Sequence, residues 1–153
     1  MEAITEAKAL ELLESLKVAH LGVVVENEPY VTPMSFIVEG NRILFRTKPG
    51  RRFEGISENP IVSIEASQFD EETGDWTSVI VRGTASVAED DATIQAALSG
   101  LFDKYREVLG SPLSRGGMQP ISSFPHVIAV EIEEITGMAS SGPFSVRTRP
   151  GRL

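Results

Sequence analysis

The sequence has no cysteine and only two histidines in 153 residues. Without cysteine, the chain can form neither a disulfide framework nor a thiolate metal site, and it has no thiol for catalysis. Two histidines are also too few for a histidine-rich metal centre. No apolar run approaches the roughly 20 residues that a membrane-spanning helix needs, and the first residues lack the basic and apolar regions of a secretory signal. We therefore expect a soluble, cytoplasmic protein that binds no metal and no membrane.

The chain is short of positive charge, with 14 Lys and Arg residues against 22 Asp and Glu residues and a formal net charge of −8. Binding to DNA or RNA without sequence preference requires the neutralisation of many phosphates over a broad surface, so this charge argues against it. The length is typical of one domain with a substantial core. Because no internal repeat or boundary divides the chain, we expect a single domain over residues 1–153.

Apolar spacing predicts two amphipathic helices, over residues 5–17 and from Asp90 or Asp91 to Tyr105, and a short helix over 53–59. β-Branched and alternating apolar residues predict six strands, against the two amphipathic helices. Because most connections are short, we expect a mainly β fold, an antiparallel six-stranded Greek-key barrel with accessory helices. The expected strands cover residues 18–26, 30–38, 42–46, 61–66, 76–88 and 126–135.

Two segments rich in Gly, Ser and Pro carry no core pattern. Residues 110–124 predict an irregular connection. From Thr136 onward no apolar pattern remains, so we expect a C-terminal tail from about residue 137. The tail contains several Arg residues. It is either disordered or crosses to a second subunit, where Arg147 or Arg149 would meet an anionic substrate or a cofactor.

Four of the 14 Lys and Arg residues fall within seven positions, 46–52 (Arg-Thr-Lys-Pro-Gly-Arg-Arg). This basic loop follows a predicted strand and precedes the predicted short helix. Arginine offers paired N–H donors that match phosphate oxygens, and Gly50 lets the backbone approach a ligand closely. A small, doubly charged anion such as a phosphate suits this loop. The alternative is a solvated turn whose charges balance neighbouring Glu residues.

The sequence lacks the common signatures of hydrolases and of nucleotide-binding loops. Gly-x-Ser-x-Gly is absent, and so are the Gly-Lys-Ser/Thr phosphate loop and Gly-x-Gly-x-x-Gly. His20 lies at the start of an apolar strand and His126 follows Phe124-Pro125, so we interpret both as structural. Paired carboxylates such as Glu133-Glu134 would diverge on a strand. Redox or group-transfer chemistry would therefore depend on a bound organic cofactor, and no catalytic residue is identified.

Five segments of the chain form an ordered series. They are Leu-Gly-Val-Val-Val at 21–25, Pro-Tyr-Val-Thr-Pro-Met-Ser-Phe at 29–36, Leu-Phe-Arg-Thr-Lys-Pro-Gly-Arg-Arg at 44–52, Ile-Ser-Glu-Asn-Pro at 56–60 and Trp-Thr-Ser-Val-Ile-Val-Arg-Gly-Thr-Ala at 76–85. In order and spacing, this series resembles the pyridoxamine 5′-phosphate oxidase-like superfamily of flavin-binding split barrels, over roughly residues 9–136. The resemblance implies a six-stranded split barrel that forms a homodimer and binds flavin mononucleotide (FMN) at the subunit interface.

The resemblance also implies three groups of cofactor-binding residues, on the second strand, in the basic loop and at the start of the fifth strand. The first group would contact the isoalloxazine and ribityl parts. The second would lie at the phosphate, with Arg51 and Arg52 as its chief ligands. The third would reach the flavin, with Ser78 coming from the partner subunit. For Met34 and Trp76 a packing role is the alternative. The full set is Thr32, Pro33, Met34, Ser35, Arg46, Thr47, Lys48, Arg51, Arg52, Trp76, Thr77 and Ser78.

Segments 29–36 and 76–79 are similar to the nitroimidazole-reductase branch of the superfamily in particular. The true pyridoxamine phosphate oxidases carry Lys where this chain has Phe36, and the nitroimidazole reductases carry His where it has Arg46. The implied function is therefore that of an FMN-dependent oxidoreductase that reduces or oxidises a small organic substrate, which the sequence does not name. The alternatives are a deazaflavin-dependent reductase and a non-catalytic module that binds flavin or haem.

Overall fold

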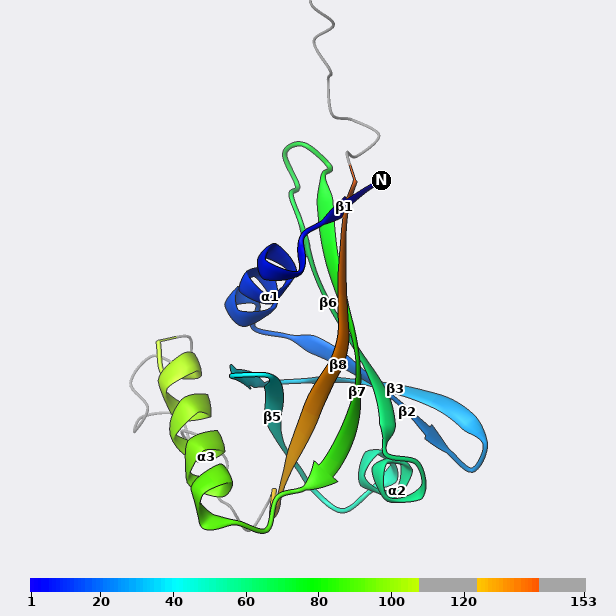
Figure 1. Ribbon diagram of the computed structural model, residues 1–153, viewed down its shortest axis with the longest axis vertical. Coiled ribbons are helices and arrows are strands. Elements are labelled where there is room, and N and C mark those ends of the chain that lie inside the picture. Colours follow the sequence, from blue (N-terminus) through cyan, green and yellow to red (C-terminus); the bar gives the residue numbers. More distant parts are fainter. Residues whose placement is uncertain (108–123, 141–153) are drawn as a thin grey trace, which may run out of the picture.

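The computed structural model describes residues 1–107 and 124–140, which form a mainly β protein around one antiparallel sheet (Figure 1). The strands pair in the order β3-β2-β6-β7-β8-β5-β4, and β1 pairs with β8 outside this path. The strands are β1 (Glu2–Ile4), β2 (Ala19–Val25), β3 (Glu28–Met34), β4 (Ile37–Glu39), β5 (Arg42–Thr47), β6 (Ile61–Phe69), β7 (Trp76–Val87) and β8 (His126–Ser140), and the helices are α1 (Glu6–Ser15), α2 (Arg51–Glu58) and α3 (Asp91–Tyr105).

The sheet curls into a barrel because its two end strands are consecutive in the chain. β3 and β4 stand at opposite ends of the strand order, yet only Ser35 and Phe36 separate them. Successive Cα atoms are about 3.8 Å apart, so this link spans at most roughly 11 Å. The predicted mainly β barrel with accessory helices is thus confirmed. The single strand predicted over 30–38 is wrong, because the chain leaves one end of the sheet at Ser35 and joins the other end after Phe36.

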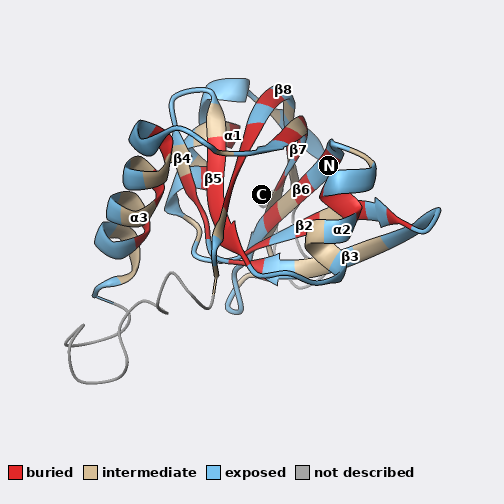
Figure 2. Cartoon of the chain, turned by 90° about the horizontal axis from the view of Figure 1, so that it is seen from below, coloured by how far each residue is buried: buried red, intermediate tan, exposed pale blue. Residues whose placement is uncertain are grey.

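Alternate residues of the strands fill the barrel interior. On β5 and β8 the interior side chains are Ile43, Phe45, Ile128 and Val130, all with no exposed surface. Figure 2 shows these strands with their buried residues in red. The opposite face of β5, which carries Leu44, packs with α3 in a second cluster. Odd-numbered residues of β5 therefore face the barrel interior, and even-numbered residues face α3.

α2 closes one mouth of the barrel. Phe53 packs against the main core cluster, and Gly55 lets the helix lie directly on β2, because a Cβ at this position would be 2.7 Å from Val23 Cγ2. The helix begins two residues before its predicted start at residue 53. Arg51 and Arg52 therefore belong to the first helical turn, and their directions are set by the helix.

β8 continues to Ser140, beyond the predicted strand end at residue 135, so the boundary predicted for the tail at residue 137 falls inside a strand. Gly137 pairs with Ile4 of β1. A Cβ on this glycine would lie 2.5 Å from Ile4 Cγ1, so the glycine permits a close neighbour and does not end the strand. β1 escaped prediction because three residues carry too little pattern. Between Arg82 and Gly83 of β7 the register against β8 shifts.

Two sequence-based predictions concern residues that the structure largely or wholly leaves undescribed. Most of the irregular connection predicted over 110–124 lies outside the described residues, as do Arg147 and Arg149 of the predicted tail. Within the described chain, no helix combines the length and the apolarity needed to cross a bilayer.

Candidate functional site

The basic loop lies where β5 ends and α2 begins. Thr47 is the last residue of β5 and is almost fully buried. Gly50 directly precedes α2 and places no side chain over the first helical turn. The first backbone N–H groups of a helix have no intrahelical acceptor. The end of β5 and the start of α2 therefore bring basic side chains and free helix amides to the same mouth of the barrel.

Arg52 is held in this mouth by hydrogen bonds to two strands. Its Nε donates to Thr47 Oγ1 at 3.1 Å, and its Nη1 donates to Thr32 Oγ1 and to the Pro33 carbonyl, both at 3.3 Å. Burial lowers the pKa of Arg52, and Tyr30 partly opposes this effect. Among the described residues, no carboxylate lies within ion-pair distance of Arg52, and its Nη2 donates no hydrogen bond. The structure thus fixes a half-buried cation without a counter-charge.

Arg51 differs from Arg52 although the two are adjacent. Its side chain is 41% exposed, and its Nη1 lies 3.6 Å from Glu26 Oε2. The guanidinium also lies over the ring of Tyr30, 5.4 Å from its centroid. Lys48 is exposed at the rim. Arg51 therefore has a partner of opposite charge, whereas Arg52 has none within the described residues.

The structure separates Arg46 from this mouth. Thr47 lies on the interior face of β5, and Arg46, its neighbour, lies on the face toward α3. Arg46 Nε donates to the Phe124 carbonyl at 3.4 Å, and its guanidinium stacks over the Phe124 ring at 5.6 Å. Burial lowers the pKa of Arg46. Phe124, in the segment that leads into β8, is therefore a partner of Arg46, which lies on the opposite face of β5 from the Thr47 that binds Arg52.

His126, which the sequence led us to interpret as structural, lies at the same mouth as Arg52. It is the first residue of β8 and pairs with Thr47 in the β5–β8 ladder. Its ring stacks on the ring of Phe53, with centroids 4.1 Å apart and planes inclined by 8°. No sequence signal could have linked His126 to the basic loop, because the pairing joins residues far apart in the chain.

The predicted site residues of β3 and the link after it differ in where their side chains lie. Thr32 contacts Arg52, as described above, and Met34 is 6% exposed and belongs to the core cluster. Ser35 is exposed and interacts with the Tyr105 side chain. The packing alternative for Met34 is therefore the better description of its position.

Tyr105 of α3 anchors the break between β3 and β4. Its hydroxyl accepts a hydrogen bond from the Phe36 N–H at 3.0 Å and can donate to the Lys17 carbonyl at 2.8 Å or to the Phe36 carbonyl at 3.2 Å. Beside it, the Lys104 amine lies 3.8 Å from the Phe36 ring centroid and has no hydrogen-bond partner among the described residues. Desolvation, with a smaller contribution from Lys17, lowers the pKa of Lys104 to about 8, and Glu14 opposes the shift.

The third predicted group, Trp76 to Ser78, lies at the opposite end of the molecule, at the tip of the β6–β7 hairpin (Figure 1). Phe45 of β5 is level with Val87 of β7, because both pair with Ile128 of β8. Thr77 is ten residues from Val87 along the same strand. At about 3.3 Å per residue, Thr77 is therefore roughly 30 Å along β7 from the level of Phe45.

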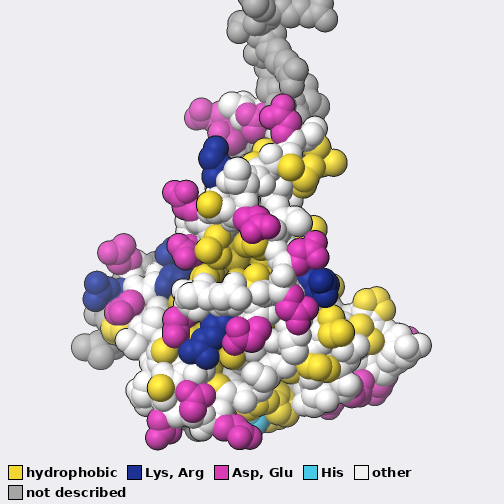
Figure 3. Space-filling view, viewed as in Figure 1, with side chains coloured by type: hydrophobic (Ala, Val, Ile, Leu, Met, Phe, Trp, Pro, Cys, Tyr) yellow, Lys and Arg dark blue, Asp and Glu magenta, His cyan; other side chains and the backbone are white. Residues whose placement is uncertain are grey.

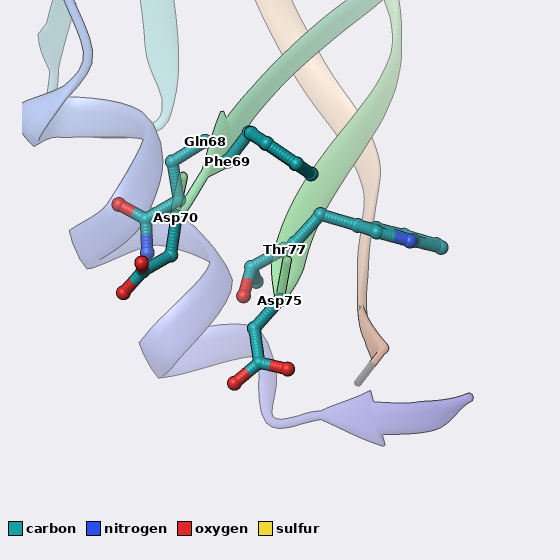
Figure 4. A pocket seen from close by; sticks show the side chains of 6 residues that line it. Gln68, Phe69, Asp70, Asp75 and Thr77 are labelled. Atoms are coloured by element: carbon teal, nitrogen blue, oxygen red, sulfur yellow. The ribbon is translucent and has the colours of Figure 1, made fainter. Parts of the chain in front are cut away.

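The hairpin tip has a shallow hollow of its own, of about 380 Å³ (Figure 4). Asp70 Oδ1 accepts hydrogen bonds from the backbone N–H groups of Glu72 and Thr73 and so organises the turn. The acidic lining does not suit a phosphate. Among the described residues, no group of three or more His, Cys, Asp or Glu side chains could hold a metal ion. The lining residues are Gln68, Phe69, Asp70, Asp75, Trp76 and Thr77.

Comparison with known proteins identifies the fold. The family model described as pyridoxamine 5′-phosphate oxidase matches residues 5–139. The chain belongs to this family. The resemblance seen in the sequence is thereby confirmed, and the barrel is a split barrel of this family's type.

Individual relatives of this oxidase-family chain are distant. An uncharacterised protein of Rhizobium meliloti (strain 1021), RA0666, is 31% identical over 65 residues, and the match covers 42% of each chain, so the chain spans less than half the length of that curated relative. A crystal structure of a FAD-binding protein (mll6688) from Mesorhizobium loti has a TM-score of 0.73 and 22% identity, covering 92% of this chain and 98% of the other. The flavocytochrome Anf3 of Azotobacter vinelandii has a TM-score of 0.68 and 20% identity, covering 92% of this chain and 70% of the other.

In this oxidase-family chain, several of the predicted site residues therefore fall into two separate clusters, and the structure adds His126 to one of them. The mouth cluster comprises Thr32, Thr47, Arg51, Arg52 and His126. The hairpin cluster comprises Trp76, Thr77 and Ser78. A single chain does not bring the two clusters together.

Proposed function

We propose that this chain is an FMN-dependent oxidoreductase that reduces or oxidises a small organic molecule, and that the phosphate of FMN binds at Arg52. The observation that carries the proposal is a half-buried guanidinium, held by hydrogen bonds to Thr47, Thr32 and Pro33, with no carboxylate beside it in the described chain. Burying a cation without a counter-charge is costly, so the site favours an anionic ligand. Family membership and the similar structure named for FAD binding support a flavin as the carrier of that anion.

The residues of the mouth fit a flavin phosphate. Arg52 Nη2 has no contact with another described residue that would occupy its donors. The first turn of α2 adds backbone N–H groups, which favour anions together with the positive end of the helix dipole. Arg51 and Lys48 add positive charge at the rim. A phosphate would thus receive charge-assisted hydrogen bonds chiefly from Arg52 and from the helix amides.

When bound, FMN supplies hydride transfer, and the protein supplies binding and orientation. Arg52 would fix the phosphate end of the cofactor. The same guanidinium holds Thr32 and the Pro33 carbonyl, so the phosphate ligand and β3 are rigidly connected. β3 would therefore flank the remainder of the cofactor, with Ser35 exposed at its far end. The reacting substrate would be a small molecule that approaches the cofactor from the side not covered by β3.

We further propose that the active unit is a homodimer, with the hairpin cluster of one subunit at the mouth cluster of the other. The hairpin cluster lies toward the opposite end of β7 from the start of α2, which favours a second chain as its link to a cofactor held at Arg52. The hairpin end is acidic, with magenta side chains gathered at the top of Figure 3, whereas Lys48, Arg51 and Arg52 lie where β5 leads into α2. Large apolar side chains are also exposed at separate points along β3, β6 and β7, and association would cover them. They are Val31 (63% exposed), Ile61 (55%), Phe69 (64%) and Ile80 (51%).

A spectrum of the purified protein tests the cofactor. We expect flavin absorbance, or its appearance when FMN is added to the colourless protein, and a dimer by analytical ultracentrifugation at micromolar concentration. A Soret band would favour the haem-binding alternative, and binding of added deazaflavin but not FMN would favour the deazaflavin reductase. A protein that binds none of these would refute the proposal. Turnover of FMN with a reductant and a small electron acceptor separates an enzyme from a binding module.

Mixing two defective variants tests the shared site. If Arg52 of one subunit and Trp76 of the other serve the same cofactor, an Arg52→Met/Trp76→Ala heterodimer contains one intact site and one doubly altered site. Refolding the two variants together should then restore about a quarter of the wild-type FMN sites, because half of the dimers are mixed and each has one intact site. Each variant alone should show little binding. No recovery in a sample with demonstrated heterodimers would contradict a site shared between subunits.

A further inference from the structure

We propose that His126 is a phosphate-binding residue, a further hydrogen-bond donor to the anion that Arg52 holds. This inference rests on the proposed function, because it assigns an additional ligand to the same phosphate. His126 belongs to no motif of the sequence, and its position follows only from the strand register and from one ring contact.

The register places the imidazole on the barrel side of the sheet. Thr47 and His126 are paired residues of β5 and β8, and the next interior pair is Phe45 with Ile128, both fully buried. Paired residues of an antiparallel ladder project to the same face, with Cβ atoms about 4.5–5.5 Å apart. His126 therefore extends the interior face to the mouth of the barrel, beside the Thr47 hydroxyl that accepts the Arg52 Nε–H at 3.1 Å.

The contact with Phe53 fixes the direction of the ring. The two rings are parallel within 8° at 4.1 Å, so one face of the imidazole is covered by a residue of the first turn of α2. Stacking leaves the edge of the ring, which carries both nitrogens, free to bond. Among the described residues, neither nitrogen of His126 makes a hydrogen bond or an ion pair. His126 is thus a held but unused donor close to Arg52.

The surrounding charges favour an anion as the missing partner. Both residues that contact or pair with His126 have a basic neighbour in the chain, because Arg52 precedes Phe53 in the helix and Lys48 follows Thr47 in the loop. No carboxylate of the described residues forms an ion pair with His126. An imidazole always has at least one N–H donor, and it has two when protonated. A phosphate oxygen would satisfy this donor and reduce the repulsion between the cations at the same time.

The test uses the small number of histidines. Because the chain has only two, the ring C–H signals of His20 and His126 can be assigned by substitution and followed by NMR. Added inorganic phosphate should shift the His126 signals in a saturable manner and leave those of His20, which pairs with Glu65 at 3.2 Å, nearly unchanged. This titration requires no flavin, so it remains decisive if FMN proves not to be the cofactor. His126 signals that do not respond to phosphate would overturn the proposal.

Three variants connect the histidine to the cofactor. His126→Phe can preserve the stack on Phe53 while removing the N–H donor, and we expect its FMN affinity to fall about tenfold, as for loss of one charge-assisted hydrogen bond. His126→Gln retains a donor and should recover part of this loss. His20→Gln is the matched control and should bind FMN like the wild type. FMN affinity of His126→Phe within twofold of the wild type would show that the residue only packs.

Discussion

Replacing Arg52 with Met should abolish most FMN binding, whereas the same replacement at Arg51 should have little effect. The sequence suggested an equivalent pair, but the structure gives the two guanidinium groups opposite surroundings. Arg52 is half-buried and lacks a carboxylate partner within the described residues, and Arg51 is 41% exposed and lies 3.6 Å from Glu26. Methionine keeps much of the aliphatic volume of arginine in both variants, so the comparison isolates the charged group.

The expected magnitudes follow from the number and burial of the bonds. Hydrogen bonds to charged groups contribute about 1.5–3 kcal/mol each. Two bonds from Arg52 to a phosphate would contribute about 3 kcal/mol or more, which corresponds to a roughly 100-fold increase in Kd. An exposed arginine with a competing carboxylate contributes about 0–1 kcal/mol, so Arg51→Met should raise Kd less than about fivefold. The stability of the FMN-free protein should change little, because two effects of Arg52→Met oppose each other. The variant loses the hydrogen bonds of Arg52, which is unfavourable, and it also loses an uncompensated charge, which is favourable.

The assay is a titration of FMN-free protein, followed by quenching of flavin fluorescence, for the wild type and both variants at one ionic strength. Thermal unfolding of the same FMN-free samples checks that each variant is folded. Equal losses of affinity in the two variants would refute the reasoning from burial. An Arg52→Met protein that binds within threefold of the wild type would remove Arg52 from the site.

Three further predictions concern stability. Because burial lowers the pKa of Lys104 from 10.5 to about 8, the charged form of Lys104 destabilises the folded state. This destabilisation of the folded protein is complete below pH 8 and disappears as the pH rises toward 10.5. After allowance for solvent screening, this loss of folding stability is ~1–2 kcal/mol. Lys104→Met should therefore raise Tm by a few degrees at pH 7 and have little effect at pH 10.5. An equal rise at both pH values would contradict this prediction. Tyr105→Phe removes the acceptor of the Phe36 N–H. It should lower the free energy of unfolding by about 1–3 kcal/mol and accelerate hydrogen exchange of the Phe36 amide. An unchanged exchange rate would show that another group accepts this hydrogen bond. Gly55→Ala should lower Tm and FMN affinity despite a helix-propensity gain of about 1 kcal/mol, because the added Cβ would lie 2.7 Å from Val23 Cγ2. A higher Tm would show that β2 moves to make room for the Cβ.

The sequence predicted those parts of the fold whose pattern is local. Interior residues of β5 and β8 alternate strictly with residues of the other face, and this period of two requires no knowledge of the partner strand. The same alternation already implies that Arg46 and Thr47 point to opposite faces of β5, so their separation could have been predicted. The break at Ser35 and Phe36 could not, because it depends on closure of the whole sheet and on the Tyr105 hydroxyl, which comes from α3.

Within the candidate site, the local part was again the predictable part. The concentration of basic residues indicated an anion site near Arg52, and the structure gathers Thr32, Thr47 and Arg52 there. The placement of His126 depends on a ladder between residues 47 and 126, and its stack with Phe53 depends on how α2 closes the barrel. Such contacts are decided by tertiary packing, and no spacing rule in a single sequence encodes them.

The two clusters also show why sequence order is a poor guide to a shared site in this fold. Trp76 and Arg52 are only 24 positions apart in the chain, yet β7 carries the first to the far end of the barrel while α2 keeps the second at its mouth. A two-fold axis perpendicular to the barrel axis exchanges the ends of the barrel as well as the subunits, so an antiparallel dimer of this kind would bring the hairpin of one chain to the mouth of another. The acidic hairpin and the basic mouth then face each other twice in one symmetric interface. If the homodimer proposed above forms, the separation of the two clusters within one chain supplies a physical reason for it, and a monomeric form of the protein would be expected to hold the phosphate of its ligand more firmly than the remainder.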